Sequence, residues 1–288
     1  MALKLGVVHN LLRQDREAFR WFRIASASSD SAIAEQARQS YENLKPQFRR
    51  VTTTLWTFPF VSSRYKNTFL YSQLKTEFRL GRLPLRPYLS LRFIGDAQQH
   101  PAEVVPQFLS ESSLIAGFGM RTPTRHGVTV WGEAGEAFNY QGRRPRGVPR
   151  AGPDYRGGIN FVRATGPTLA NRWSGKFIET NVDAVYVSRF DDDVVGYWQV
   201  RPGYRPAPSG GFNAKVYFNL NLTADTKRQY WANYAEFGPG IRLRVPGVSP
   251  PMDLSVNVVR GVHLANRFNP RGPNYWDVRV GLWYSFAM

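Results

Sequence analysis

Hydrophobic and polar positions alternate most clearly near the C-terminus, in the segment VRVGLWYSF at residues 278–286. Successive side chains of an extended strand point to opposite faces. One face of this segment therefore carries only hydrophobic residues: Val278, Val280, Leu282, Tyr284 and Phe286. The other face is mixed, with polar Arg279 and Ser285 beside Gly281 and Trp283. A strand of this kind fits a soluble β-sandwich or a β-barrel in a membrane.

The same period of two continues through most of the chain after Pro46. In FLYSQLKTEFRL at 69–80, for example, leucine and phenylalanine alternate with charged or polar residues. The alternation predicts twelve strands, at residues 48–61, 66–80, 84–95, 111–121, 127–137, 154–163, 173–188, 194–202, 212–224, 230–245, 251–262 and 274–286. An even number of strands keeps both ends of the sheet on one side.

The lengths of the connections between strands distinguish a membrane barrel from a soluble sandwich. GRLP, TPTRH and VPGVSP are short, whereas residues 96–110 and 138–153 form longer loops. Short turns on one rim and longer loops on the other are typical of outer-membrane barrels. A sandwich gives no reason for a polar face so rich in long charged residues of both signs. We therefore predict a mainly β fold, a closed antiparallel transmembrane β-barrel at residues 48–288.

Residues 3–44 have a helical period instead, and we predict a helical domain at 1–47. Its spacing of Leu5-Gly6, His9, Ala18, Phe22 and Ala25 resembles the tetratricopeptide pattern L-G-x2-Y, A-x3-F-x2-A. His9 replaces the usual tyrosine, and Asp30 stands where the terminating proline is usual. Because stacking needs about three or more repeats, we expect this to be the last repeat of an array in a longer protein.

Composition excludes several classes of protein. The chain has no cysteine, so disulfides and thiolate metal sites are excluded. No apolar run approaches the ~18 residues of a transmembrane helix. The net charge of +17 raises the question of nucleic acid. However, arginine is spread along alternating positions, without zinc-finger spacing or an RNA-binding motif, so we expect no nucleic acid. Acidic glycans and lipopolysaccharide phosphates remain as anionic partners.

The polar face of the predicted strands gives the candidate lumen of the barrel. Its bases are Lys75, Arg79, Arg86, Arg92, Arg121, Arg156, Arg201, Lys215, Arg242, Arg244 and Arg279. Its acids are Glu77, Glu133, Glu179, Glu236, Asp253 and Asp277. Ion pairs across strands would explain most of these residues, while the surplus of bases favours anions in the pore. Glu236, Glu77 and Glu133 could neutralise the basic rows at 242/244 and 86/92, or a polyanion could pass beside them.

Flat and amide-bearing side chains share this face and would suit a saccharide path: Tyr71, Tyr88, Trp131, Tyr197, Tyr217, Trp283, Asn219 and Asn221. Alternatively, the aromatic residues serve only for packing.

Catalysis has little support in the sequence. The histidines are scattered without metal-ligand spacing, although His126 or His263 could pair with a serine as in outer-membrane lipases. FDDD at 190–193 could bind a divalent cation but is more typical of an acidic turn. The basic loop GRRPRGVPR at 142–150 could contact lipopolysaccharide or cargo. We expect no cofactor, no metal site and no catalytic residue.

The C-terminal residues Val280, Leu282, Tyr284 and Phe286 resemble the signal read by the outer-membrane barrel assembly machinery, although Ala287 and Met288 follow the phenylalanine. Helices followed by a C-terminal barrel resemble the outer-membrane exporters of cellulose and poly-N-acetylglucosamine, and the phage adsorption protein A group. The resemblance implies a Gram-negative outer membrane, periplasmic helices that bind protein partners, and export of an exopolysaccharide. The alternatives are a passive anion-selective porin for acidic oligosaccharides and a barrel lipid hydrolase.

Overall fold

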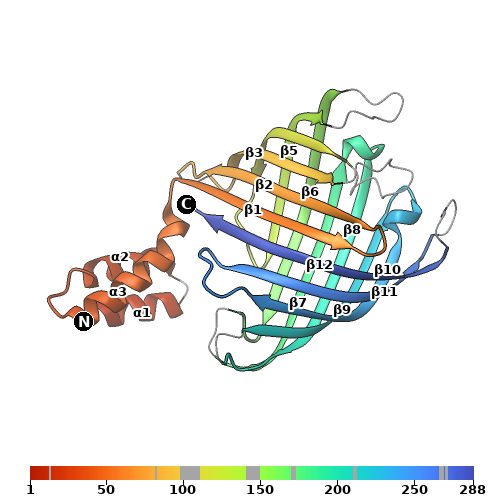
Figure 1. Cartoon of the computed structure of the whole chain (residues 1–288). Helices are drawn as coiled ribbons and strands as arrows, with labels where there is room; N and C mark the ends of the chain where they lie inside the picture. Colours follow the sequence, from red (N-terminus) through yellow and green to blue (C-terminus); the bar gives the residue numbers. More distant parts are fainter. Residues whose placement is uncertain are drawn as a thin grey trace. The chain divides into compact units, whose positions relative to one another are not determined.

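The computed structural model describes residues 1–12, 14–81, 83–97, 111–140, 150–169, 173–209, 213–265, 269 and 272–288, without the side chains of residues 46 and 47. The chain forms two compact units (Figure 1). The helical unit is Met1–Thr52 with Met288, and the barrel unit is Thr53–Ala287.

Within its described residues, the helical unit holds three α-helices, α1 (Ala2–Leu11), α2 (Asp15–Ala25) and α3 (Ser31–Leu44), and the 3-10 helix η1 (Lys45–Phe48). The predicted helical region is confirmed. Gly6 lets α1 approach α2 closely, because a Cβ there would lie 2.6 Å from ring atoms of Phe22. Asp30 caps α3 by accepting hydrogen bonds from the backbone of Ala32 and Ile33, at 2.9 and 3.2 Å. Assignment to the tetratricopeptide repeats stays a prediction.

The described part of the barrel unit contains twelve strands: β1 (Val51–Ser62), β2 (Asn67–Phe78), β3 (Arg86–Asp96), β4 (Ser113–Arg121), β5 (Val128–Asn139), β6 (Ala151–Thr165), β7 (Gly175–Val187), β8 (Asp193–Arg205), β9 (Ala214–Asp225), β10 (Tyr234–Arg244), β11 (Met252–His263) and β12 (Asn274–Ala287). Each strand pairs with its neighbours in the sequence, and β1 closes the sheet on β12. Their antiparallel register runs from Thr54 opposite Ala287 to Ser62 opposite Arg279. The predicted closed barrel is therefore confirmed, and a sandwich is excluded.

Several predicted strand ends need correction, and at three of them a short 3-10 helix takes the place of strand. Phe48 lies in η1, where its ring is tilted against that of Phe19 with ring centres 4.6 Å apart, so β1 begins only at Val51. Residues 230–232 form the 3-10 helix η3 (Tyr230–Ala232) before β10. Residue 188 begins another 3-10 helix, η2 (Ser188–Phe190). A tight turn follows it, in which the backbone of Asp191 and Asp192 has the left-handed conformation. The aromatic residues in these short helices continued the apparent alternation.

The barrel has two different rims. We call the rim where β1 begins and β12 ends the proximal rim, and the opposite one the distal rim. The two longest connections, 97–112 and 140–150, both join strands at the distal rim. This agrees with the predicted division between short turns and long loops.

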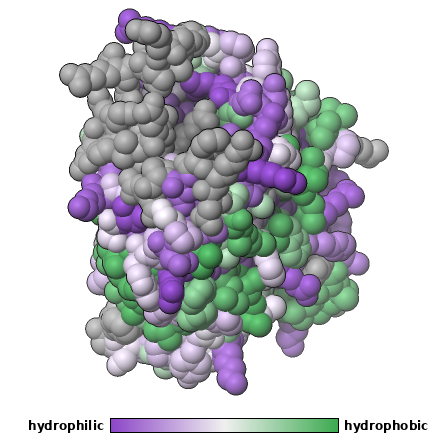
Figure 2. Space-filling view, turned by 90° about the vertical axis from the view of Figure 1, so that its right-hand side faces the viewer, coloured by the Kyte–Doolittle hydropathy of each residue, from purple (hydrophilic) through white to green (hydrophobic). Residues whose placement is uncertain are grey.

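The outer face of the barrel is apolar. Every strand exposes at least one large hydrophobic side chain on this face, for example Val61, Leu74, Leu89, Phe118, Val130, Ile159, Ile178, Trp198, Leu220, Phe237, Val258 and Val278. On the face of the molecule drawn in Figure 2, hydrophobic side chains gather into patches below a more hydrophilic region. A closed barrel with an apolar exterior is the architecture of transmembrane β-barrels, because closure satisfies every strand edge in lipid. Among the described residues, no helix is long and apolar enough to cross a membrane.

Candidate functional site: the lumen of the barrel

The predicted polar face points into the barrel, opposite the exposed hydrophobic side chains. Many of its members are buried there, including Tyr88, Arg156, Lys215, Tyr217, Asn219 and Asn221. Arg79 lies just past the end of β2. Alternation along the strands thus gave the orientation of these side chains, and the structure adds their partners.

Glu77 on β2 is the centre of an ionic cluster near the proximal rim. Its carboxylate accepts hydrogen bonds from Arg121 at 2.5 and 2.7 Å. Lys75 lies 2.9 Å from it and Arg86 lies 4.0 Å from it. Further along the lumen, Glu133 on β5 pairs with Arg92 on β3 at 3.3 Å. Glu77 and Glu133 therefore neutralise the basic row at 86/92.

A second group of ion pairs lies on β7 and β9–β12. Glu179 holds Lys215 at 2.7 Å and Arg242 at 3.6 Å, and Asp253 holds Arg244 at 2.5 Å. Glu236 was expected to neutralise the row at 242/244, but its carboxylate pairs with Arg279 instead. The reason is position, because Glu236 lies near the distal end of β10 whereas 242 and 244 lie near its proximal end.

Acids that we did not predict in the lumen reduce the expected surplus of positive charge. Arg156 pairs with Asp154 at 2.6 Å and also with Glu111, which lies 3.0 Å from Arg189. Asp183 accepts a hydrogen bond from Asn160 at 2.5 Å. Asp154 shares the alternation of Arg156, so the sequence did carry a signal for it. Glu111 lies before β4 and had no such signal.

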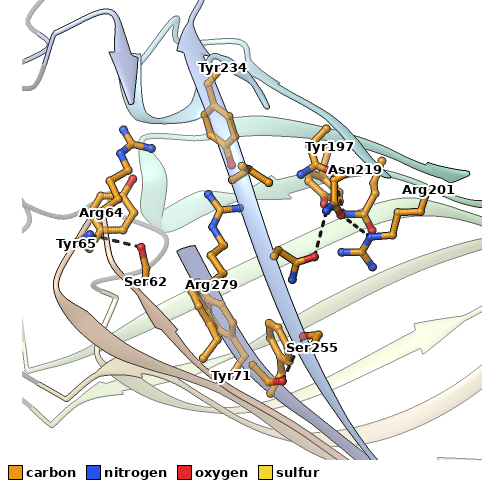
Figure 3. Close-up of a pocket in the computed structure, with 17 residues that line it drawn as sticks. Ser62, Arg64, Tyr65, Tyr71, Tyr197, Arg201, Asn219, Tyr234, Ser255 and Arg279 are labelled. Atoms are coloured by element: carbon orange, nitrogen blue, oxygen red, sulfur yellow. Dashed lines mark hydrogen bonds between the residues drawn. The ribbon is translucent and has the colours of Figure 1, made fainter. Parts of the chain in front are cut away.

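A cavity of about 220 Å³ lies inside the barrel towards the distal rim (Figure 3). We call it the lumen cavity. It is lined by Phe58, Phe60, Ser62, Arg64, Tyr65, Tyr71, Tyr197, Gln199, Arg201, Asn219, Asn221, Tyr234, Ser255, Asn257, Val259, Arg279 and Gly281. The cavity thus gathers six of the predicted path residues: Tyr71, Tyr197, Arg201, Asn219, Asn221 and Arg279.

Other predicted path residues lie outside the cavity lining and pack against cations. The Lys75 ammonium lies 5.4 Å from the ring centre of Tyr88. The Arg92 guanidinium lies 5.7 Å from that of Trp131. These rings stabilise the ionic clusters through cation–π contacts, in agreement with the packing alternative.

Arg201 differs from its paired neighbours. Its Nε donates to Oδ1 of Asn219 at 2.8 Å, and its guanidinium lies 5.0 Å from the ring centre of Tyr217. Among the described residues, no carboxylate lies within 4.0 Å of it, since Glu179 is held by Lys215 and Arg242. Arg201 is therefore oriented by neutral groups at the edge of the cavity.

The amide side chains around Arg201 are held in fixed positions. Gln199 donates to the hydroxyl of Tyr197 at 2.6 Å and to Asn221 at 2.9 Å. Asn219 donates to the Gly238 carbonyl and to Asn257, both at 3.1 Å. Gln199 and Asn257 were not predicted, although Gln199 shares the alternation of Tyr197 and Arg201.

The turn between β1 and β2 also contributes to the cavity. Tyr65 in this turn is buried, and burial raises the pKa of its phenol, so the hydroxyl stays protonated as a donor. Ser62 accepts a hydrogen bond from the Tyr65 backbone at 3.4 Å. Turn residues have no alternation, so the sequence could not place Arg64 and Tyr65 in the lumen.

The structure gives positions and partners for the candidate catalytic and metal residues that it describes. Both ring nitrogens of His263 have partners, with Nδ1 at 2.8 Å from the Tyr230 carbonyl and Nε2 at 2.7 Å from Arg64. His126 lies in the turn before β5. Asp191 and Asp192 form a turn, and Asp193, the first residue of β8, accepts a hydrogen bond from the Thr226 hydroxyl at 2.6 Å. Within the described ranges, no cluster of possible metal ligands occurs. His100 and most of the loop at 142–150 lie outside the described residues.

The predicted assembly signal lies on the outer face of β12. Val280 is exposed there, and the rings of Tyr284 and Phe286 lie 6.4 Å apart. Phe286 stands opposite Leu55 of β1 at the seam where the barrel closes.

No protein-family model and no curated protein sequence matches this chain. Solved structures similar to it include a bacterial polysaccharide outer membrane secretin, with 8% identity over 83% of this chain and 98% of that chain and a TM-score of 0.37. An outer membrane channel from Pseudomonas putida F1 has 8% identity over 82% of this chain and 95% of that chain, with a TM-score of 0.35. The β domain of the Bordetella autotransporter BrkA has 13% identity over 83% of this chain and 100% of that chain, with a TM-score of 0.34. At these identities and TM-scores the likeness gives no information on function.

Proposed function

We propose that this protein is a channel of the Gram-negative outer membrane that carries saccharides, and that its task is the export of an exopolysaccharide. It acts without catalysis or a cofactor. The observation that carries the proposal is the pairing of an apolar exterior with a lumen cavity lined by tyrosine, amide and arginine side chains.

The exterior supports the location. Hydrophobic side chains such as Leu89, Phe118 and Ile159, each more than half exposed, would be costly in water but are stable against lipid chains. Long distal loops suit the outer surface of the cell, and the proximal rim, where β1 begins, suits the periplasm. The helical unit precedes β1 and so belongs on the periplasmic side, where it would bind protein partners.

The lining supports the class of solute. Sugars have apolar faces of C–H groups and edges of hydroxyl groups, so aromatic rings with amide side chains recognise them well. Phe60 and Tyr71 form a ring pair 6.1 Å apart, and Asn219 and Asn221 bring amides to the same space. Lipopolysaccharide would contact the outside of the distal rim.

A second candidate is uptake of acidic oligosaccharides through a passive anion-selective pore. Arg201 has no carboxylate partner in the described part of the lumen, and this favours an acidic solute. Export and uptake share the same lumen and differ in direction and in the partners of the helical unit.

Proteoliposomes test the proposal directly. Vesicles that contain the purified barrel should swell in iso-osmotic monosaccharide and disaccharide, at rates well above those of protein-free vesicles. Vesicles that contain correctly folded barrel but swell no faster would refute the proposal of a saccharide channel.

A further inference from the structure

The lumen cavity has two chemically different sides. On β1 and β2, Phe58, Phe60 and Tyr71 form a continuous aromatic panel, with ring centres 5.4 Å apart between Phe58 and Phe60 and 6.1 Å apart between Phe60 and Tyr71. On β8 and β9, Gln199, Arg201 and Asn219 present amide and guanidinium groups. In the order of strands around the barrel, β8 and β9 are well separated from β1 and β2.

The cationic side is prepared for an anion. Asn219 accepts a hydrogen bond from Nε of Arg201, and the guanidinium lies 5.0 Å from the ring centre of Tyr217, so the two groups that orient Arg201 are neutral. By contrast, Arg279 in the same cavity is already paired with Glu236 and Asp277. A planar guanidinium binds carboxylate in a bidentate way. A cation inside a low-dielectric barrel without a carboxylate partner is costly, unless an anion offsets the cost.

The size of the cavity suits a small occupant. A volume of about 220 Å³ is several times the ~30 Å³ that one water occupies in the liquid, so the cavity has room for a sugar ring. Figure 3 shows Arg201 and Tyr197 on one side of this space and Arg64 and Tyr65 on the other, with Arg279 between them.

We propose that the lumen cavity is a binding subsite for one acidic sugar unit, whose carboxylate binds Arg201 while its ring packs against the aromatic panel of Phe58, Phe60 and Tyr71. This inference rests on the proposed function and deepens it, because it names uronic acids as the class of sugar. Gln199 and Asn221 lie beside Arg201 and serve as partners of the ring hydroxyls.

Equilibrium binding to the full chain in detergent tests the subsite without any need for transport. The probes are D-galacturonate, D-galactose, acetate and inorganic phosphate. Galacturonate should bind at least about tenfold more tightly than galactose, as one charge-assisted hydrogen-bonded pair implies. Acetate and phosphate should bind more weakly than galacturonate, because they lack the ring.

Two variants isolate Arg201. R201Q should weaken galacturonate binding by about ten- to a hundredfold and leave galactose unchanged, whereas R201K should retain part of the preference. R260Q removes the same charge from the exposed outer face of β11 and should bind like the native protein. The subsite is overturned if R201Q binds galacturonate as tightly as the native protein, or if acetate or phosphate binds as tightly as galacturonate. A barrel that binds galacturonate but does not swell vesicles would instead refute the channel.

Discussion

Arg121 on β4 reaches across β3 and donates two hydrogen bonds to Glu77 on β2, at 2.5 and 2.7 Å. The pair joins strands that are not neighbours in the sheet. It therefore fixes the curvature of the wall as well as its charge. The same carboxylate also holds Lys75, so its removal leaves several cations without compensation.

Glu77→Gln should destabilise the barrel by about 3 kcal/mol, because a charge in a buried cluster loses its partner. Reversible unfolding in urea with lipid vesicles would measure the change. Glu35→Gln is the matched control, since the pair of Glu35 with Arg38 is exposed and should cost less than about 1 kcal/mol. Equal losses in the two variants would mean that Glu77 is not structurally important.

Replacing the arginines of the two basic rows should change ion selectivity. Arg86, Arg92, Arg242 and Arg244 each pair with a carboxylate. Changing all four to glutamine removes four positive charges and leaves Glu133 and Asp253 without their arginine partners, so the lumen should shift towards cations. The reversal potential across a salt gradient reports this shift, and it should shrink at high salt.

The control for this variant removes the same charge from the helical unit, by changing Arg16, Arg20, Arg23 and Arg38 to glutamine. It should keep the native reversal potential. An unchanged reversal potential in the lumen variant would show that these pairs do not face the conducting path.

Phe286→Ser should impair assembly in cells much more than it lowers the stability of refolded protein. Loss of the ring should lower the free energy of unfolding by only ~1–2 kcal/mol, the contribution of its burial. Its place at the β1–β12 seam suits recognition by the barrel assembly machinery. The amount of heat-modifiable barrel in the outer-membrane fraction measures assembly. Phe118→Ser makes the same change on the outer face of β4 and should assemble better. If Phe286→Ser reaches the membrane at the native level, the assembly signal is wrongly assigned.

Gly6→Ala should destabilise the helical unit by about 1–3 kcal/mol, because the new Cβ would lie 2.6 Å from the Phe22 ring. Thermal loss of the helical circular-dichroism signal, or of protease resistance in residues 1–52, would detect it. Adding Phe22→Leu should recover part of the loss, since the ring that clashes is gone. Native-like stability of Gly6→Ala would argue against this close approach of α1 and α2.

The sequence predicted the barrel well because alternation decides which face each residue joins. It placed Tyr197, Arg201 and Asn219 in the lumen before their partners were known. The sequence did not predict which acid pairs with which base. Arg121 binds Glu77 across an intervening strand, and Glu236 binds Arg279 rather than Arg242. These pairings depend on the stagger between strands and on the curvature of the barrel wall, and the alternation of residues along one strand determines neither. Glu111 and Arg64 reach the lumen from outside the strands, where no period exists.

Single-channel recording in planar bilayers, with galacturonate oligosaccharides added to one side, tests the central claim most directly. If the protein is a saccharide channel, the current should show discrete conductance steps and a preference for anions. The acidic oligosaccharide should interrupt this current more often than a neutral oligosaccharide does. A barrel that inserts and shows heat-modifiable mobility, yet conducts no ions or prefers cations and ignores both sugars, would contradict the account.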